Sequence, residues 1–130
     1  MKVDINNDTN HCEVVIDSSD CWDLDFTLSS IIHPALVKFK EEETGCCSID
    51  KEDVPEYLHS TYGTAEEYAE KYSHDAWIWV IDEMIWAFGE TASGNLNEPI
   101  WTSSDEFKKY KNRKSNGHRL FGKYLSGLWN

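Results

Sequence analysis

The chain has 130 residues and a formal net charge of −12, which is enough residues for one hydrophobic core and too few for two. No apolar run reaches the roughly 18 residues that a membrane span requires, and the N-terminus lacks the basic and then apolar order of a secretion signal, so we expect a cytoplasmic protein without a membrane partner. Duplex DNA is not expected as a ligand of so acidic a chain, because binding to phosphates is driven by Lys and Arg side chains that release counterions.

Residues 1–17 predict a short β-hairpin. Val3 and Ile5 alternate with polar residues, residues 6–10 form a cluster of turn-forming residues, and residues 12–16 are mostly β-branched or apolar. The polar residues 17–20 then end the hairpin.

The cysteines give no clear metal-binding pattern. There are four of them: Cys12, Cys21, Cys46 and Cys47. None has the spacing that is typical of a zinc site, and vicinal cysteines do not readily bridge to each other. His11 with Cys12 and Cys21 would supply at most a partial set of ligands. We therefore expect reduced thiols, no metal and no cofactor.

Residues 24–44 predict an amphipathic helix. After Leu28, the apolar residues recur with the helical period: Ile31, Ile32, Ala35, Leu36 and Phe39. Asp25 and Thr27 are both candidates for the N-cap, because a short side chain with an oxygen accepts hydrogen bonds from free backbone N–H groups. Pro34 predicts a kink or a restart of the helix, since it removes a backbone donor.

Residues 64–91 predict the central helix, either continuous or broken near residue 73. One face of its second half is apolar and is expected in the core: Trp77, Val80, Ile81, Met84, Ile85 and Phe88. The opposite face carries two tryptophans with three acids beside them, and these five residues are the candidate binding site: Trp79, Trp86, Asp82, Glu83 and Glu90.

Residues 104–129 predict a basic C-terminal helix, interrupted or weakened near 115–117. All 24 acidic residues lie at or before Glu106, so residues 1–106 carry 5 − 24 = −19 and the last 24 residues carry +7. The seven cations are Lys108, Lys109, Lys111, Arg113, Lys114, Arg119 and Lys123. Such asymmetry indicates either docking within the chain or an external partner.

Two interpretations of the tryptophan face remain open. In the first, the basic segment covers this face, with Lys and Arg stems over the indoles and their charged ends at the acids. In the second, the face stays open and binds something cationic, aromatic or proteinaceous, since exposed Trp is typical of interface hot spots.

Asp23 and Asp25 match the D-x-D-x-T-[LV] spelling of the nucleophile motif in haloacid-dehalogenase-like phosphatases. That chemistry requires both carboxylates at the tip of a buried parallel strand, which reads as a continuous apolar run. The residues before Asp23 are polar, and residues two apart on a helix point about 200° apart. We therefore interpret both acids as residues of a helix start, which is favoured by the helix dipole.

Three blocks in order, "WDLDFTLSSIIHPALVKFKEE", "WIWVIDEMIWAF" and "GHRLFGKYLSGLWN", resemble a family of small uncharacterised bacteriophage proteins. The family pattern is W-x-L-D-[YF]-[TS], then M-I-x-A-F, then L-F-x-K-Y-[FL]-x-x-L-W. The resemblance covers about half of the chain. It implies a phage genome and an infected bacterial host, and in the family the position of Asp23 is not reliably acidic.

The sequence thus predicts a mainly α-helical single domain of three principal helices with an N-terminal hairpin. Its aromatic core is expected from Trp22, Trp77, Phe88, Phe121 and Trp129. The leading functional hypothesis is a non-enzymatic phage accessory protein that binds a host protein, in particular one that antagonises host defence. Two alternatives are a sponge for a small signal nucleotide, held at Trp79 and Trp86, and a phosphatase using Asp23 and Asp25.

Overall fold

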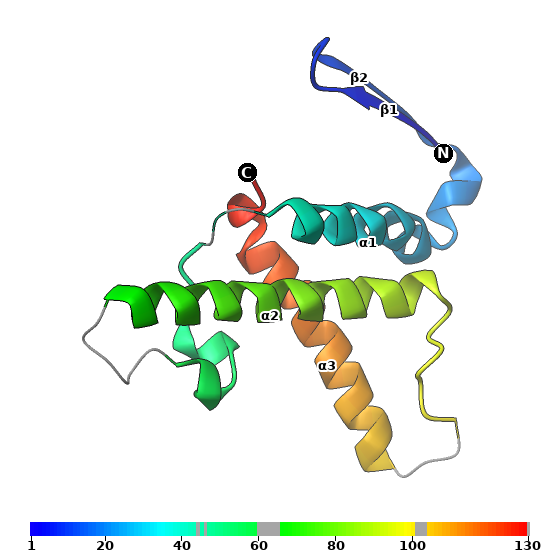
Figure 1. Ribbon diagram of the computed structural model, residues 1–130. Helices are drawn as coiled ribbons and strands as arrows, with labels where there is room; N and C mark the ends of the chain where they lie inside the picture. Colours follow the sequence, from blue (N-terminus) through cyan, green and yellow to red (C-terminus); the bar gives the residue numbers. More distant parts are fainter. Residues whose placement is uncertain (44, 46, 60–65, 101–103, 130) are drawn as a thin grey trace.

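The computed structural model describes the chain except residues 44, 46, 60–65, 101–103 and 130; the side chains of 66–72 also lie outside the described part. The protein is mainly α-helical, with three long helices after an N-terminal hairpin, which confirms the predicted fold class (Figure 1). The long elements are β1 (Lys2–Asn6), β2 (His11–Val15), α1 (Leu24–Glu42), α2 (Glu66–Ala92) and α3 (Ser104–Lys123). Short 3-10 turns lie between and after them: η1 (Ser18–Cys21), η2 (Lys51–Asp53), η3 (Glu56–Leu58) and η4 (Leu125–Gly127).

α2 is the central helix of the body. It packs against both α1 and α3: α1 lies along it, and α3 crosses it at a steep angle (Figure 1). The face of α2 that carries Trp77, Val80, Ile81 and Met84 is fully buried. Leu120 of α3 completes this core with an exposed fraction of 0%.

α2 and α3 approach each other closely at Gly117. A Cβ atom built on Gly117 would lie 2.4 Å from the Cβ of Ala87 and 2.6 Å from the backbone oxygen of Glu83. Only a glycine fits at this crossing, because any larger side chain would push the helices apart. The predicted interruption at 115–117 is therefore wrong: α3 continues through these residues, and Gly117 serves the packing between helices.

Three other details differ from the sequence prediction. α1 continues through Pro34, whose missing donor is tolerated without a break in the helix. α2 continues through residue 73, so the alternative of a broken helix is wrong. α3 ends at Lys123 instead of residue 129, and η4 follows it as a separate turn.

Two of the aromatic residues expected in the core are outside it. The exposed fraction is 82% for Trp22 and 76% for Trp129, whereas Trp77 and Phe88 are buried as predicted. The prediction failed because both exposed residues lie at the ends of helical segments, where an apolar side chain has few neighbouring elements to cover it.

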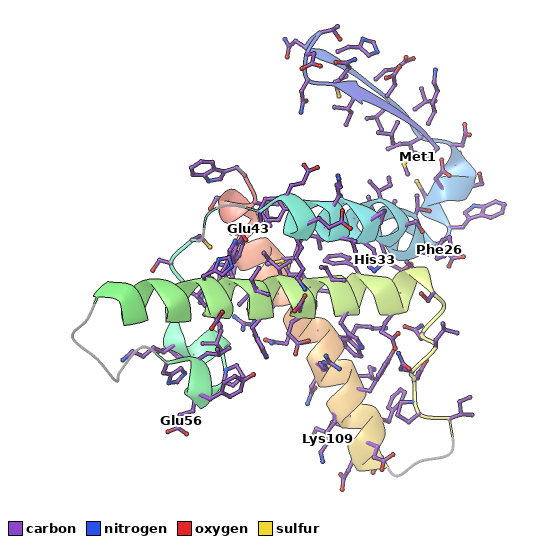
Figure 2. All side chains as sticks on the ribbon, in the orientation of Figure 1. Met1, Phe26, His33, Glu43, Glu56 and Lys109 are labelled. Atoms are coloured by element: carbon purple, nitrogen blue, oxygen red, sulfur yellow. The ribbon has the colours of Figure 1, made fainter. Side chains whose placement is uncertain are left out.

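The hairpin extends away from the three helices (Figure 1). β1 and β2 are antiparallel, with Val3 opposite Val14 and Ile5 opposite Cys12. Alternation along a strand places these four residues on one face and the polar residues of both strands on the other. Side chains on both faces project into solvent (Figure 2), and every residue of both strands is exposed.

Candidate functional site

The basic helix α3 covers part of the tryptophan face. The guanidinium carbon of Arg113 lies 3.9 Å from the centroid of the Trp86 ring, a cation–π contact. The same guanidinium forms an ion pair with Glu83, with 3.0 Å between Nη2 and Oε2. Tyr110 meets the Trp86 ring edge to face at 5.6 Å between centroids. This is the arrangement that the first interpretation describes, with an Arg over an indole and its charge at an acid.

The other predicted site residues have separate partners. Asp82, which is exposed, accepts a hydrogen bond from Nζ of Lys40 on α1 at 2.6 Å. Glu90 is only 5% exposed, and its two carboxylate oxygens accept hydrogen bonds from the backbone and side-chain nitrogens of Asn97, each at 3.0 Å. Glu90 therefore fixes the loop that follows α2. Trp79 is half-buried and packs against the core.

These five residues therefore do not converge on one open pocket. Trp86 and Glu83 face α3, Asp82 faces α1, and Glu90 faces the loop after α2. The hypothesis of a nucleotide held between Trp79 and Trp86 gains no support from this geometry, because Arg113 and Tyr110 already contact the Trp86 ring.

The C-terminal half of α3 is held by an acidic residue that the sequence did not single out. Asp53, 6% exposed, accepts hydrogen bonds from Nη2 of Arg119 at 2.7 Å and from Nζ of Lys123 at 2.6 Å. The hydroxyl of Tyr124 donates to the same carboxylate. Lys123 also pairs with Asp50 at 2.7 Å. The loop before α2 is thereby fixed to the end of α3.

This cluster changes the protonation of its members. Burial alone would raise the pKa of Asp53, but the hydrogen bonds from Lys123, Tyr124 and Arg119 outweigh burial and lower its pKa to about 2. The hydrogen bonds to Asp50 and Asp53 raise the pKa of Lys123. Charge asymmetry in the sequence indicated either a docked basic segment or an external partner. It could not indicate Asp53, because the long connection around that residue has no periodicity that orients it.

Of the four other cations of the basic segment, one is hydrogen-bonded within the chain and three are exposed. Nζ of Lys114 donates to the side-chain oxygen of Asn95 at 2.8 Å. Lys108, Lys109 and Lys111 are exposed on the first half of α3, where it extends beyond α2 (Lys109 is labelled in Figure 2). The cations of the basic segment are therefore paired from Arg113 onward, whereas the three cations before it are exposed.

Asp23 and Asp25 lie at the start of α1. Asp23 is the residue before the helix, Asp25 is in its first turn, and both are exposed. Within the described part of the chain, the sheet consists of β1 and β2 alone, which are antiparallel. No parallel strand tip in that part holds the two carboxylates together, as the phosphatase chemistry requires. Neither Asp25 nor Thr27 is the N-cap residue; instead, Oγ1 of Thr27 donates to the backbone oxygen of Asp20.

The first 31 residues, which we call the N-terminal arm, expose most of the large apolar side chains. Of the 17 large apolar residues that are exposed in the described part, 11 lie at or before Ile31. They are Met1, Val3, Ile5, Val14, Val15, Ile16, Trp22, Leu24, Phe26, Leu28 and Ile31. This exposed surface was not predicted from the sequence, because alternating β-branched residues and an apolar helical face predict burial but do not show which element covers them.

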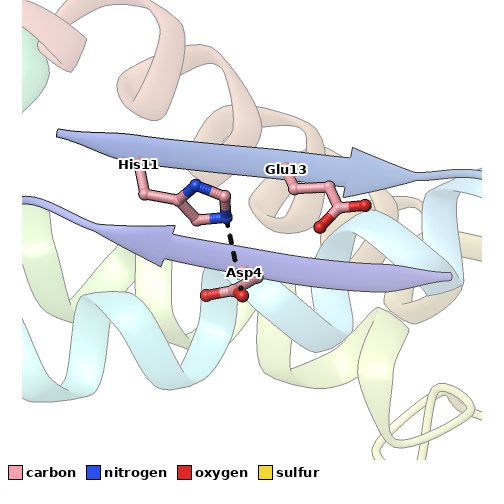
Figure 3. Close-up of side chains that lie close together, drawn as sticks. All are labelled: Asp4, His11 and Glu13. Atoms are coloured by element: carbon pink, nitrogen blue, oxygen red, sulfur yellow. Dashed lines mark ion pairs between the residues drawn. The ribbon is translucent and has the colours of Figure 1, made fainter. Parts of the chain in front are cut away.

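The polar face of the hairpin gathers Asp4, His11 and Glu13 (Figure 3). Their ligand atoms lie within 4.8 Å of one another, and Nε2 of His11 is 3.6 Å from Oδ2 of Asp4. All three side chains are exposed, which leaves their charges hydrated. This geometry is that of a weak surface ion pair, present when His11 is protonated.

No family model matches the chain, and no curated protein or solved structure is similar to it. No helix in the described part of the chain is long and apolar enough to cross a membrane.

Proposed function

We propose that the protein is a non-enzymatic phage accessory protein that binds and modulates a host protein in the cytoplasm of an infected bacterium, with antagonism of host defence as its specific role. The single observation that carries the binding function is the apolar surface of the N-terminal arm. The resemblance of three sequence blocks to bacteriophage proteins supports the phage and host setting.

The arm has the properties of a surface that requires a partner. An isolated two-stranded hairpin is marginally stable in water, and this one exposes an apolar face that includes Ile5 at 58% and Val14 at 48%. Contiguous exposed apolar surface on a soluble domain marks an interaction site or an aggregation hazard. Trp22, at 82% exposure, adds the residue type most enriched among interface hot spots.

The ionisable groups of the body support binding over catalysis. A catalytic acid or base must reach a substrate, but the buried Asp53 is neutralised by Arg119 and Lys123. The buried Glu90 is likewise occupied by Asn97. Both carboxylates act on the fold, and neither is free to transfer a proton.

The negative charge indicates the chemistry of the partner. Residues 1–106 carry −19, and four of the seven cations beyond them are occupied within the chain. The field of such a body favours a basic partner, so the protein would imitate nucleic acid to a host protein that binds it.

Affinity purification of the tagged chain from infected cells tests this proposal. We expect a basic host protein to be recovered at low salt and to be lost at high salt, because exposed charges are screened beyond about 10 Å at 0.1 M salt. Recovery that is equal at low and high salt would contradict nucleic-acid mimicry, and recovery of no host protein at either salt concentration would contradict the binding function.

A further inference from the structure

A cavity of about 350 Å³ lies where the three long helices meet, and neither the hairpin nor Trp86 lines it. Its apolar walls come from all three helices: Leu28 and Ile32 of α1, Phe88 of α2 and Phe121 of α3. The rings of Phe88 and Phe121 meet edge to face at 4.9 Å between centroids. The volume of this cavity is in the range of small-molecule binding sites, and its walls are mostly apolar, as is usual for a ligand pocket.

Three polar side chains, one from each helix, also line this cavity: Ser29, Thr91 and His118. Ser29 is 3% exposed, and within the described residues its hydroxyl has no hydrogen-bond partner. Its neighbour Ser30 differs, because the Ser30 hydroxyl donates to the backbone oxygen of Phe26 at 2.8 Å. The Ser29 hydroxyl is not fully buried, because among the described residues only Oε1 of Glu43 is a fully buried side-chain atom without a hydrogen bond. The hydroxyl is therefore accessible to a ligand or to water as a donor and an acceptor.

The ring of His118 packs on Phe88 at 4.8 Å between centroids, and within the described residues its nitrogens have no hydrogen bond. Burial first, and then the charge of Lys114, lower the pKa of His118, although Asp25 acts in the opposite direction. At neutral pH the ring is therefore uncharged and offers one donor and one acceptor.

The edge of the cavity carries no net charge. Lys114 and Asp25 both line it and have opposite signs. Lys114 is already hydrogen-bonded to Asn95, so it is not available as a dedicated site for an anion. A ligand with a net charge would gain little here. A planar uncharged ligand with both donors and acceptors would match the aromatic walls and the three polar groups.

We propose that this cavity binds a small, planar, uncharged heteroaromatic molecule whose ring nitrogens and amino or carbonyl groups bond to Ser29, Thr91 and His118. The pocket shares Leu28 with the N-terminal arm but includes neither the hairpin nor Trp22, whose exposed side chains support the proposed host-protein surface. Failure of either proposal would leave the other standing.

Titration of the isotope-labelled full chain, followed by NMR, tests the pocket with two probes, adenine and indole. Adenine has donors and acceptors around its ring, whereas indole has a single donor. We expect adenine to shift the amide signals of Ser29, Thr91 and His118, and to bind more tightly than indole. Absence of shifts at these residues up to the solubility limit of adenine would overturn the proposal, as would indole binding at least as tightly.

The substitution Ser29→Ala, with Ser30→Ala as its matched control, tests the hydrogen bond itself. Removal of one neutral hydrogen bond should weaken adenine binding about threefold to tenfold in Ser29→Ala and leave it unchanged in Ser30→Ala. Ser29→Ala should fold normally, because it removes an unpaired hydroxyl. Thermal unfolding checks this. Equal affinity of the folded Ser29→Ala variant and the wild type would overturn the assignment of Ser29.

Discussion

Asp53 shows how one buried carboxylate fixes two distant segments. Its oxygens accept hydrogen bonds from Arg119 and Lys123, which lie 66 and 70 residues further along the chain. Loss of the carboxylate would leave two cations against a buried amide or methyl group. Removal of one member of a buried ion pair destabilises a protein because the other charge is left uncompensated. The contribution of Asp53 to stability is therefore measured by replacing it.

We predict that Asp53→Asn lowers the free energy of unfolding by about 2–4 kcal/mol, because it leaves Arg119 without a counter-ion and Lys123 with the exposed Asp50 alone. The matched control is Asp50→Asn, which removes an exposed partner of the same Lys123 and should cost less than about 1 kcal/mol. Chemical denaturation at pH 7 measures both. Equal effects of the two substitutions would contradict the buried role of Asp53.

The stability that Asp53 provides should also depend on pH. The folded-state pKa is lowered to about 2 from the ordinary value of 3.8, so its stabilisation is complete above pH 5 and is lost as pH falls toward 2. A shift of this size corresponds to about 2 kcal/mol. We expect the difference in unfolding free energy between wild type and Asp53→Asn to shrink from pH 6 to pH 2. A difference that is constant over this range would show that folding does not lower the pKa of Asp53.

Individual residues were predictable from the sequence where a period determined their surroundings. The face of α2 that includes Trp77, Val80 and Met84 follows from helical spacing, and these residues are buried. Trp22 and Trp129 have no such context, because each lies where a helical segment begins or ends. Their apolar character predicted burial, but local sequence carries no information about which distant element covers a chain end.

At the scale of elements, two glycines of α3 differ in whether they contribute to its packing on α2. Gly117 lies against Ala87 and Glu83, whereas a Cβ on Gly122 would have no atom within 4 Å. Both lie within α3, where glycine is a poor helix former. The sequence predicts the same unfavourable effect on the helix for both glycines. The difference between them follows only from the position at which α3 crosses α2.

We predict that Gly117→Ala lowers the free energy of unfolding by about 2 kcal/mol, since the new methyl group overlaps the backbone of α2. Gly122→Ala should instead raise it by about 0.5–1 kcal/mol through better helix propensity. Thermal or urea unfolding of both variants gives the comparison. The same sign of change in both would contradict the close approach at Gly117.

The contact between Arg113 and Trp86 gives a second prediction for the packing of α2 on α3. Arg113→Ala should uncover the Trp86 ring and increase quenching of tryptophan fluorescence by acrylamide, in a background where the exposed Trp22 and Trp129 are replaced by Phe. Arg113→Lys should restore the charge but not the stacked planar group, so it should give intermediate quenching. Unchanged quenching in Arg113→Ala would show that α3 does not cover this indole.

Over the whole molecule, ion pairs within the chain explain part of the charge asymmetry between residues 1–106 and the basic segment. Arg113, Arg119 and Lys123 meet Glu83, Asp50 and Asp53, so α3 from Arg113 onward neutralises part of the charge of the body to which it is docked. The sequence predicted that the two charged parts could meet. It did not predict that the hairpin would extend away from the helices, because alternation specifies an apolar face but not its partner.

The proposed division of the molecule is a helical body that serves as a scaffold and an N-terminal arm that binds. The body buries its core among α1, α2 and α3, while the arm exposes its apolar residues. If this division is correct, a substitution in the arm should reduce binding without reducing stability. A similar substitution at an exposed site of the body should change neither.

The most direct test measures the dissociation constant of the recovered host protein for wild type, Trp22→Ala and Trp129→Ala. Both tryptophans are highly exposed, at 82% and 76%, so neither substitution should alter the fold, and the two variants differ only in where the ring is lost. We predict a loss of affinity of tenfold or more for Trp22→Ala, on the order of the 2 kcal/mol that defines a hot spot, and no change for Trp129→Ala. Equal affinity of Trp22→Ala and wild type would contradict binding through the N-terminal arm.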